Sequence, residues 1–167
     1  KKRAEKWNKA LLTVDWLSTQ IDEESKFQIY AFNTEAWPVL DDTEGQWLEV
    51  GEDARNLERA VAATRNIVPQ GGTRLHAAME AVYSLRPLPD NIFLLIDSLP
   101  SQGERRATER GTVSGKQRER FFEQAVARLP TGIPVNVILY PMEGDPMAAS
   151  WYWKLATITG GSFMSPS

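Results

Sequence analysis

Two short stretches of the sequence combine residue types that can hold a cation. The first is Gly71-Gly72-Thr73, in which the glycines let the backbone approach a ligand closely and the threonine offers a hydroxyl oxygen. The second is Asp97-Ser98, which directly follows an apolar run. A hydroxyl and a carboxylate, completed by water, are the hard oxygen ligands that Mg²⁺ or Mn²⁺ prefers. Threonine and aspartate also favour caps and turns, so a purely structural role for both is the alternative.

The apolar run before Asp97 predicts the kind of sheet that presents this carboxylate. Residues 92–96 read Ile-Phe-Leu-Leu-Ile, without the polar alternation of a half-exposed strand. Such a run is typical of a strand buried on both faces, which requires helices on both sides of a mostly parallel sheet. Ligands bind outside the carboxyl ends of the strands in these sheets. We therefore expect Asp97 to mark the functional edge.

The rest of the pattern predicts the elements of one α/β layer sandwich. Pro38 cannot donate a backbone hydrogen bond, which places its strand at a sheet edge, in a hairpin with the strand before it. Asp53 is expected to cap the second helix, and Gly160-Gly161 to end the last one. The expected helices are 4–21, 54–67, 75–82, 121–129 and 147–158, and the expected strands are 27–32, 36–40, 92–96, 133–140 and 162–164, with a brief extended piece at 47–50.

Length and composition limit the classes of function. The chain has 167 residues, which predicts a single domain over 1–167. Its net charge of -3 argues against a nucleic-acid binder, which normally carries a basic stripe. The sequence has no cysteine, which excludes disulfides, thiolate metal ligands and thiol nucleophiles from this chain. No apolar stretch approaches the roughly 20 residues that span a membrane.

Five stretches, in order along nearly the whole chain, resemble the von Willebrand factor type A (VWA) domain. The most specific pair is the Gly71-Gly72-Thr73 turn together with a strand that ends in Asp97. The resemblance implies a Rossmann-like, doubly wound and mostly parallel sheet with an antiparallel edge strand. The five stretches are 27–33, 69–79, 92–103, 134–139 and 155–163.

The resemblance also implies a metal-ion-dependent adhesion site on the upper edge of the sheet. The family's site takes oxygens from an Asp-x-Ser-x-Ser loop after the first strand, from a Thr in a second loop and from an Asp after the fourth strand. Thr73 matches the second position and Asp97 the third, while Gly71, Gly72 and Ser98 belong to the ligand-binding edge. The sequence contains no Asp-x-Ser-x-Ser, and Ser98 stands where the family usually has Gly.

The family's first strand, which is central in the sheet, is also missing from this chain. A parallel sheet without it would leave unpaired backbone groups between two apolar layers. We therefore expect an upstream segment to supply the strand; the alternatives are a separate chain that donates it and a sheet that has closed up. With Thr73 and Asp97 as the only protein ligands, Mg²⁺ or Mn²⁺ is expected to bind this chain weakly or not at all. In the intact domain, the resemblance implies that the ion accepts an acidic side chain from a protein partner.

The resulting prediction is a non-enzymatic module for protein–protein interaction or adhesion. A degenerate, metal-free scaffold of the same fold is one alternative. Another is an enzyme that uses Asp97 as a phosphoryl acceptor, which the leucine at position 99 disfavours because that chemistry needs a second carboxylate there. A nucleotide site is not expected, since residues 111–117 lack the phosphate-loop pattern. The similarity to bacterial members favours the bacterial cell envelope, periplasmic or membrane-tethered.

Three further features carry expectations that the structure can test. His76, the single histidine, is expected to be a partly exposed helix residue rather than a ligand. Trp37, Trp47 and Trp153 are expected to pack, with an exposed contact patch as the alternative. Residues 101–118, rich in Ser, Gly, Thr and charge, are expected to form a solvated, mobile loop, with a partner-binding loop as the alternative.

Overall fold

A computed structural model describes residues 2–104 and 112–166 of the chain. Its α-helices are α1 (Lys2–Ser18), α2 (Arg55–Thr64), α3 (Leu75–Ser84), α4 (Gly115–Val126) and α5 (Ala148–Thr159), and a 3₁₀ turn covers Glu52–Ala54. Its strands are β1 (Lys26–Phe27), β2 (Tyr30–Phe32), β3 (Ala36–Pro38), β4 (Leu48–Glu49), β5 (Ile92–Ile96), β6 (Val135–Leu139) and β7 (Phe163–Met164). This order confirms the expected α/β fold. None of the helices in the described ranges has the length and apolar character to cross a membrane.

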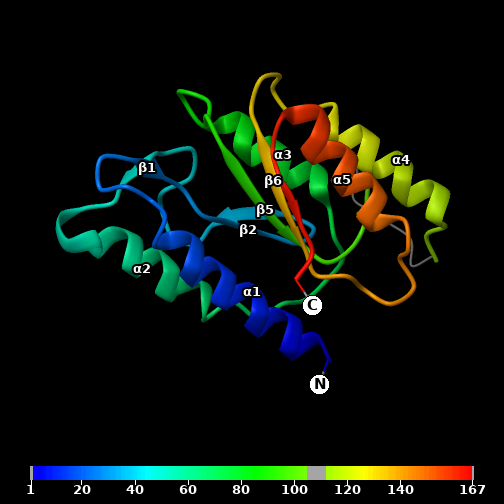
Figure 1. The fold of residues 1–167 in the computed structure, drawn as a ribbon, viewed down its shortest axis with the longest axis horizontal. Coiled ribbons are helices and arrows are strands. Elements are labelled where there is room, and N and C mark those ends of the chain that lie inside the picture. Colours follow the sequence, from blue (N-terminus) through cyan, green and yellow to red (C-terminus); the bar gives the residue numbers. More distant parts are fainter. Residues whose placement is uncertain (1, 105–111, 167) are drawn as a thin grey trace.

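The parallel sheet consists of β5, β6 and β7, with β6 in the middle. β5 and β6 are in register over their full length, with Leu94 opposite Val137, and β7 pairs in parallel with the other side of β6. Every second side chain of β6, from Val135 to Leu139, is almost completely buried in a core shared with α3, α4 and α5. These three helices lie together beside the sheet (Figure 1).

The first half of the chain forms a smaller unit around its own apolar cluster. β1 pairs antiparallel with β4, and β2 pairs antiparallel with β3. Phe27, Leu57 and Val61 lie in the cluster, and Val14 of α1 packs against it. In Figure 1, α1 and α2 lie together on the side of β5 and β6 opposite to α3, α4 and α5. Within the described residues β3 has β2 as its one partner, so the edge position expected for Pro38 is confirmed.

The two units do not share a sheet. β2 and β5 belong to different sheets, and among residues 2–104 and 112–166 the edge of β5 that faces away from β6 has no strand partner. Phe93 of β5 is 50% exposed, so the expectation of a strand buried on both faces is wrong. Phe93 is exposed because α1 and α2 pack on their own apolar cluster and do not cover this face of β5. The closed-up sheet is therefore excluded, while an upstream segment or a separate chain that supplies a strand stays a prediction.

Two expectations about the first half of the chain are wrong for local reasons. The expected strand 27–32 is interrupted, because β1 and β2 pair with different partners. Asp53 does not cap α2: it lies inside the 3₁₀ turn in a left-handed conformation, with φ of 52°. The N-cap residue is Ala54, whose side chain has no oxygen to accept the free helix N–H groups.

The expected loop 101–118 is shorter than predicted. Residues 105–111 lie outside the described residues, and α4 already begins at Gly115. Ser114 caps it: its side chain accepts from the Gln117 backbone N–H, and the Gln117 side chain accepts from the Ser114 backbone N–H. This capping box is visible in the sequence as Ser-x-x-Gln, although the polar residues around it favour a loop. At the other end of the chain, Gly160 ends α5 with φ of 75°, as expected.

Candidate functional site

Three loops meet at the carboxyl end of β5 and are joined by hydrogen bonds. The backbone N–H groups of Ser101 and Gln102 donate to the Thr73 carbonyl at 2.9 and 3.1 Å. The Thr73 N–H donates in return to Ser101 Oγ at 2.9 Å. The Arg74 N–H donates to the Asn33 carbonyl at 2.7 Å, which adds the turn between β2 and β3. The loop of Thr73 is therefore fixed against the loop that follows Asp97.

The two glycines before Thr73 are explained by the shape of this junction. Gly71 has φ of +83°, a left-handed conformation that side-chain-bearing residues rarely adopt. A Cβ atom on Gly72 would lie 2.8 Å from Ser101 Oγ, which is too close. Gly71 therefore serves the conformation of the turn, and Gly72 serves the close approach of the two loops.

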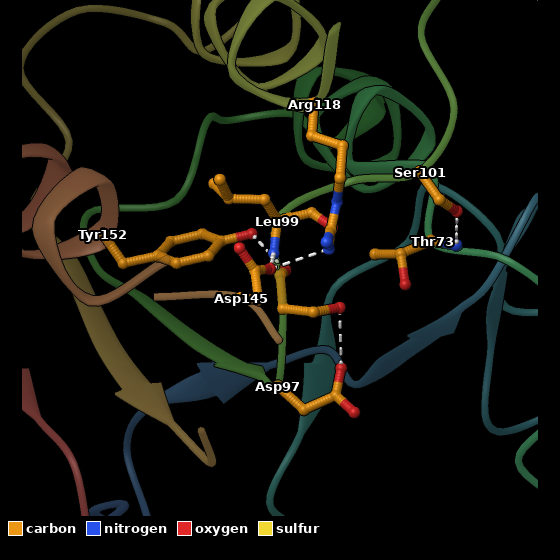
Figure 2. Close-up of polar contacts among 8 residues, drawn as sticks. Thr73, Asp97, Leu99, Ser101, Arg118, Asp145 and Tyr152 are labelled. Carbon is orange, nitrogen blue, oxygen red and sulfur yellow. Dashed lines mark hydrogen bonds and ion pairs between the residues drawn. The ribbon is translucent and has the colours of Figure 1, made fainter. Parts of the chain in front are cut away.

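Asp97 and Ser98 leave β5 at this junction. The Ser98 hydroxyl donates to Asp97 Oδ1 at 3.1 Å (Figure 2). Asp97 and Thr73 are both half-buried, whereas Ser98 is buried. No residue of the described ranges forms a hydrogen bond with the Thr73 hydroxyl, which leaves that oxygen available. The sequence-predicted residues thus lie on neighbouring loops of one edge.

A largely buried ion pair between Arg118 and Asp145 holds the segment that follows Asp97. Asp145, in the loop after β6, accepts from Arg118 Nη2 at 2.7 Å and from the Leu99 N–H at 2.7 Å. The side chains of Asp145 and Arg118 are only 5% and 16% exposed. Arg118 also donates to the Leu99 carbonyl at 2.5 Å, so α4 and the loop of Asp145 are both tied to the segment after Asp97 (Figure 2). Because removing one partner would leave a buried charge uncompensated, this pair fixes the loop geometry.

Tyr152 of α5 completes the support. Its ring is fully buried, and its hydroxyl donates to the Ser98 carbonyl at 3.0 Å. Burial raises the pKa of the Tyr152 hydroxyl well above the usual value of 10.0; the negative charges of Asp145 and Asp97 raise it further, and Arg118 opposes them. Tyr152 therefore stays neutral and acts as a fixed hydrogen-bond donor.

The oxygens at this edge fit a divalent ion only in part. Among the described residues, no three His, Asp or Glu side chains are placed to hold a metal ion together. Asp145 is already engaged by Arg118 and the Leu99 N–H, which leaves Asp97 and Thr73 from the predicted set. Two protein oxygens would leave most of an octahedral shell to water.

His76 does not belong to this edge. It is 2% exposed, so the expectation of a partly exposed residue is wrong. Its side chain turns into the protein, and Nδ1 lies 3.4 Å from Glu80 Oε2, one helical turn along α3. The first turn of α3 is buried because α4 and the 101–104 loop pack against it, which periodicity alone does not reveal. Trp153 is 58% exposed, so the expectation that it packs is wrong, whereas Trp37 and Trp47 are half-buried.

Among solved structures, two are similar to this chain in overall fold. The von Willebrand factor type A protein from Catenulispora acidiphila matches with a TM-score of 0.58 and 15% sequence identity, over 98% of this chain and 33% of that chain. The present chain has the VWA fold. The human COPII-coat protein Sec24c matches with a TM-score of 0.57 and 15% identity, over 93% of this chain and 26% of that chain.

These similarities establish the fold alone, because the sequence identity is low. The VWA-like chain spans a third or less of the length of either matched chain. No protein-family model matches the sequence, and no curated protein matches it either.

Sequence reasoning found the edge and missed its support. Thr73 and Asp97 were recognisable because each follows a local pattern, a glycine turn or an apolar run. Arg118 and Asp145 carry no such signal, since they are 27 residues apart and meet only through folding. Tyr152 resembles any other core aromatic in the sequence.

Proposed function

We propose that this VWA-like chain is a non-enzymatic module that binds a protein partner at the edge formed by the loops of Thr73 and Asp97. The observation that supports this most directly is the junction between residues 71–74 and 97–104, which carries the Thr73 hydroxyl, without a hydrogen-bond partner among the described residues, on one loop and the half-exposed Asp97 carboxylate on the neighbouring one. The buried pair of Arg118 and Asp145 makes the junction rigid, and a rigid edge loses little entropy when a partner binds.

We further propose that the edge is a partial metal-ion-dependent adhesion site for Mg²⁺ or Mn²⁺. Thr73 and Asp97 would each supply one oxygen, and water would supply the rest. The ion would offer an open position to an acidic side chain of the partner. With so few protein ligands, its affinity for this chain should be low, with a Kd of about 1 mM or above.

A Mn²⁺ titration followed by water-proton relaxation tests this proposal. We expect weak saturable binding to the wild-type chain and a loss of about tenfold or more in Asp97→Asn and in Thr73→Ala. Asp90→Asn is the matched control, because Asp90 is an exposed aspartate just before the opposite end of β5. Binding that is the same in all four proteins would remove Thr73 and Asp97 from the site.

A metal-free scaffold is the second candidate, and one contact favours it. The Ser98 hydroxyl already donates to the Asp97 carboxylate, so this carboxylate has a hydrogen-bond donor even without an ion. If the wild-type chain binds no Mn²⁺ and Ser98→Gly restores weak binding, the scaffold candidate holds for this chain. The phosphoryl-transfer alternative gains no support, because Arg118, the cation that Figure 2 draws at that edge, is paired with Asp145.

A further inference from the structure

The charges of the chain are unevenly distributed along the sequence. Residues 20–54 contain ten acidic side chains and one basic side chain, Lys26, whereas the net charge of the whole chain is only -3. This segment forms β1, β2, β3, β4 and their connections. Residues 20–54 therefore carry a formal net charge of -9, one basic against ten acidic side chains, which attracts cationic groups.

Two adjoining cavities open on this unit. The first, of about 570 Å³, lies between α2 and the chain after β3, and its apolar lining is formed by Val39, Leu40, Leu48 and Ala63. The second, of about 340 Å³, is lined by Trp37, Pro38, Asp41, Asp42 and Glu44. Asp41 lines both cavities, so they are neighbours on this unit. We call the pair the groove: its first cavity has a mixed lining that includes the four apolar residues, and its second cavity is acidic.

The acidic end of this groove lacks internal compensation. Asp41, Asp42 and Glu44 are exposed, and no ion pair from residues 2–104 or 112–166 neutralises them. The geometry also does not suit a metal, since the described carboxylates nowhere form a group of three that could hold one. A larger, organic cation fits this arrangement better. Trp37 provides an aromatic surface against which such a cation can stack.

The groove is separate from the edge described above. β2 ends at Phe32, next to Asn33, whose carbonyl accepts from Arg74. β3 runs antiparallel to β2, so Pro38 and the residues after it lie at the opposite end of the hairpin. A ligand in the groove would leave the loops of Thr73 and Asp97 uncovered.

We infer that this groove binds a basic, extended peptide segment of a partner protein. A Lys or Arg side chain of the segment lies against Trp37, close to Asp42 and Glu44. A neighbouring apolar side chain fills the cavity lined by Val39, Leu40 and Leu48. The apolar side chains give the groove a sequence preference that an acidic surface alone lacks. A peptide in which basic and apolar residues are adjacent binds more tightly, because its apolar side chain is also buried.

Replacing Arg59 tests this inference, because the inference predicts tighter rather than weaker binding. Arg59 lines the apolar cavity and is the single basic residue among those lining the groove. Its charge repels a basic ligand, so Arg59→Gln should tighten binding by about threefold. The double variant Asp42→Asn/Glu44→Gln should weaken binding by about tenfold or more.

The experiment measures fluorescence anisotropy with a library of amidated hexapeptides in which Lys or Arg alternates with Leu or Val. A second library carries Glu in place of the basic residues. Asp22→Asn/Glu23→Gln is the matched control: it removes the same charge from the same acidic segment, but neither residue lines the groove. Circular dichroism checks that all variants are folded.

We expect saturable binding of basic members, no binding of the Glu library, and an unchanged affinity in the control. If the control variant weakens binding as much as Asp42→Asn/Glu44→Gln does, recognition is only diffuse attraction and the inference is wrong. It is also wrong if no basic peptide binds saturably, or if Arg59→Gln weakens binding. A Mn²⁺ titration is independent of these outcomes, because Asp97 and Thr73 are unchanged in every variant.

Discussion

The hydroxyl of Tyr152 shows how one buried group can stabilise an edge without taking part in binding. It holds the Ser98 carbonyl directly after Asp97, in surroundings from which water is excluded. A buried phenol stays protonated there because its anion would face the carboxylates of Asp97 and Asp145 in a low-dielectric environment. The same residue therefore couples the position of the candidate site to the stability of the fold.

Tyr152→Phe should lower the free energy of unfolding by about 1 kcal/mol near neutral pH, because the ring remains and one hydrogen bond is lost. The raised pKa of Tyr152 gives this contribution a pH dependence. Below the usual tyrosine pKa of 10.0 the phenol is protonated in both the folded and the unfolded chain. Above that pH the unfolded chain loses the proton first, so the stability provided by the hydroxyl decreases as pH rises.

Urea unfolding from about pH 8 to about pH 11 measures this dependence. The stability difference between wild type and Tyr152→Phe should shrink, and then change sign, as pH rises through this range. Tyr83→Phe is the control, because Tyr83 is 53% exposed. A difference that stays constant over the whole range would contradict the assignment of a raised pKa to Tyr152.

At the scale of elements, the turn from α5 into β7 depends on a position without a side chain. A Cβ atom on Gly161 would lie 2.0 Å from the Val135 carbonyl oxygen and 2.4 Å from its carbon. Both atoms belong to the backbone of the central strand β6, so neither can move aside as a flexible side chain would.

Gly161→Ala should therefore destabilise the protein by about 3 kcal/mol, seen as a lower midpoint in thermal or urea unfolding. Gly115→Ala provides the comparison, because no atom lies within 4 Å of a Cβ placed there and Gly115 is the first residue of α4. That variant should be unchanged or slightly more stable, since alanine favours a helix more than glycine does. Equal effects at the two positions would show that the close approach to β6 is unimportant.

The open edge of β5 leads to a second prediction at this scale. The Ile92 N–H donates to the Pro134 carbonyl and the Ile96 carbonyl accepts from Tyr140, so residues 92, 94 and 96 direct their backbone groups toward β6. Those of Phe93 and Leu95 point to the unpaired side. In hydrogen–deuterium exchange, the Phe93 and Leu95 amides should exchange faster than those of Leu94 and Ile96.

Addition of a partner chain that supplies a strand should abolish this alternation. If all four amides are equally protected in the isolated chain, another strand already covers the edge in solution, and the pairing described above is incomplete.

At the scale of the whole molecule, the chain has two apolar clusters rather than one. One joins β5, β6 and β7 to α3, α4 and α5, and the other joins α1 and α2 to the short hairpins. Among the described residues no strand joins the two clusters; Phe32 of β2 packs against the larger one, and polar contacts such as the bond from Lys6 Nζ to the Pro141 carbonyl add to this. Loss of packing in one cluster should therefore be felt mainly within that cluster.

Leu57→Ala and Leu155→Ala test this division, because the two leucines are 4% and 1% exposed in different clusters. Each should cost about 2–5 kcal/mol locally. Native-state exchange should show faster amides in α1 and α2 for Leu57→Ala, with β6 unaffected, and the reverse for Leu155→Ala. Uniform acceleration throughout the chain in both variants would show that the two clusters unfold as one.

Local patterns in the sequence were sufficient for the class of the fold and for the two principal residues of the candidate site. The apolar run that becomes β5, the glycine turn before α3 and the left-handed Gly160 each express a preference of adjacent residues. Such preferences act over a few positions, so one sequence reveals them.

Only the tertiary structure shows which residues from distant parts of the chain are in contact. The burial of His76, the pairing of Arg118 with Asp145, and the exposure of Phe93 depend on elements that are distant in the chain. Contacts of this kind arise from packing, and a buried charge or an open strand edge leaves no mark in the residues beside it. The acidic groove combines the two: its charge is evident from the sequence, whereas its cavities exist only because α2 and the chain after β3 come together.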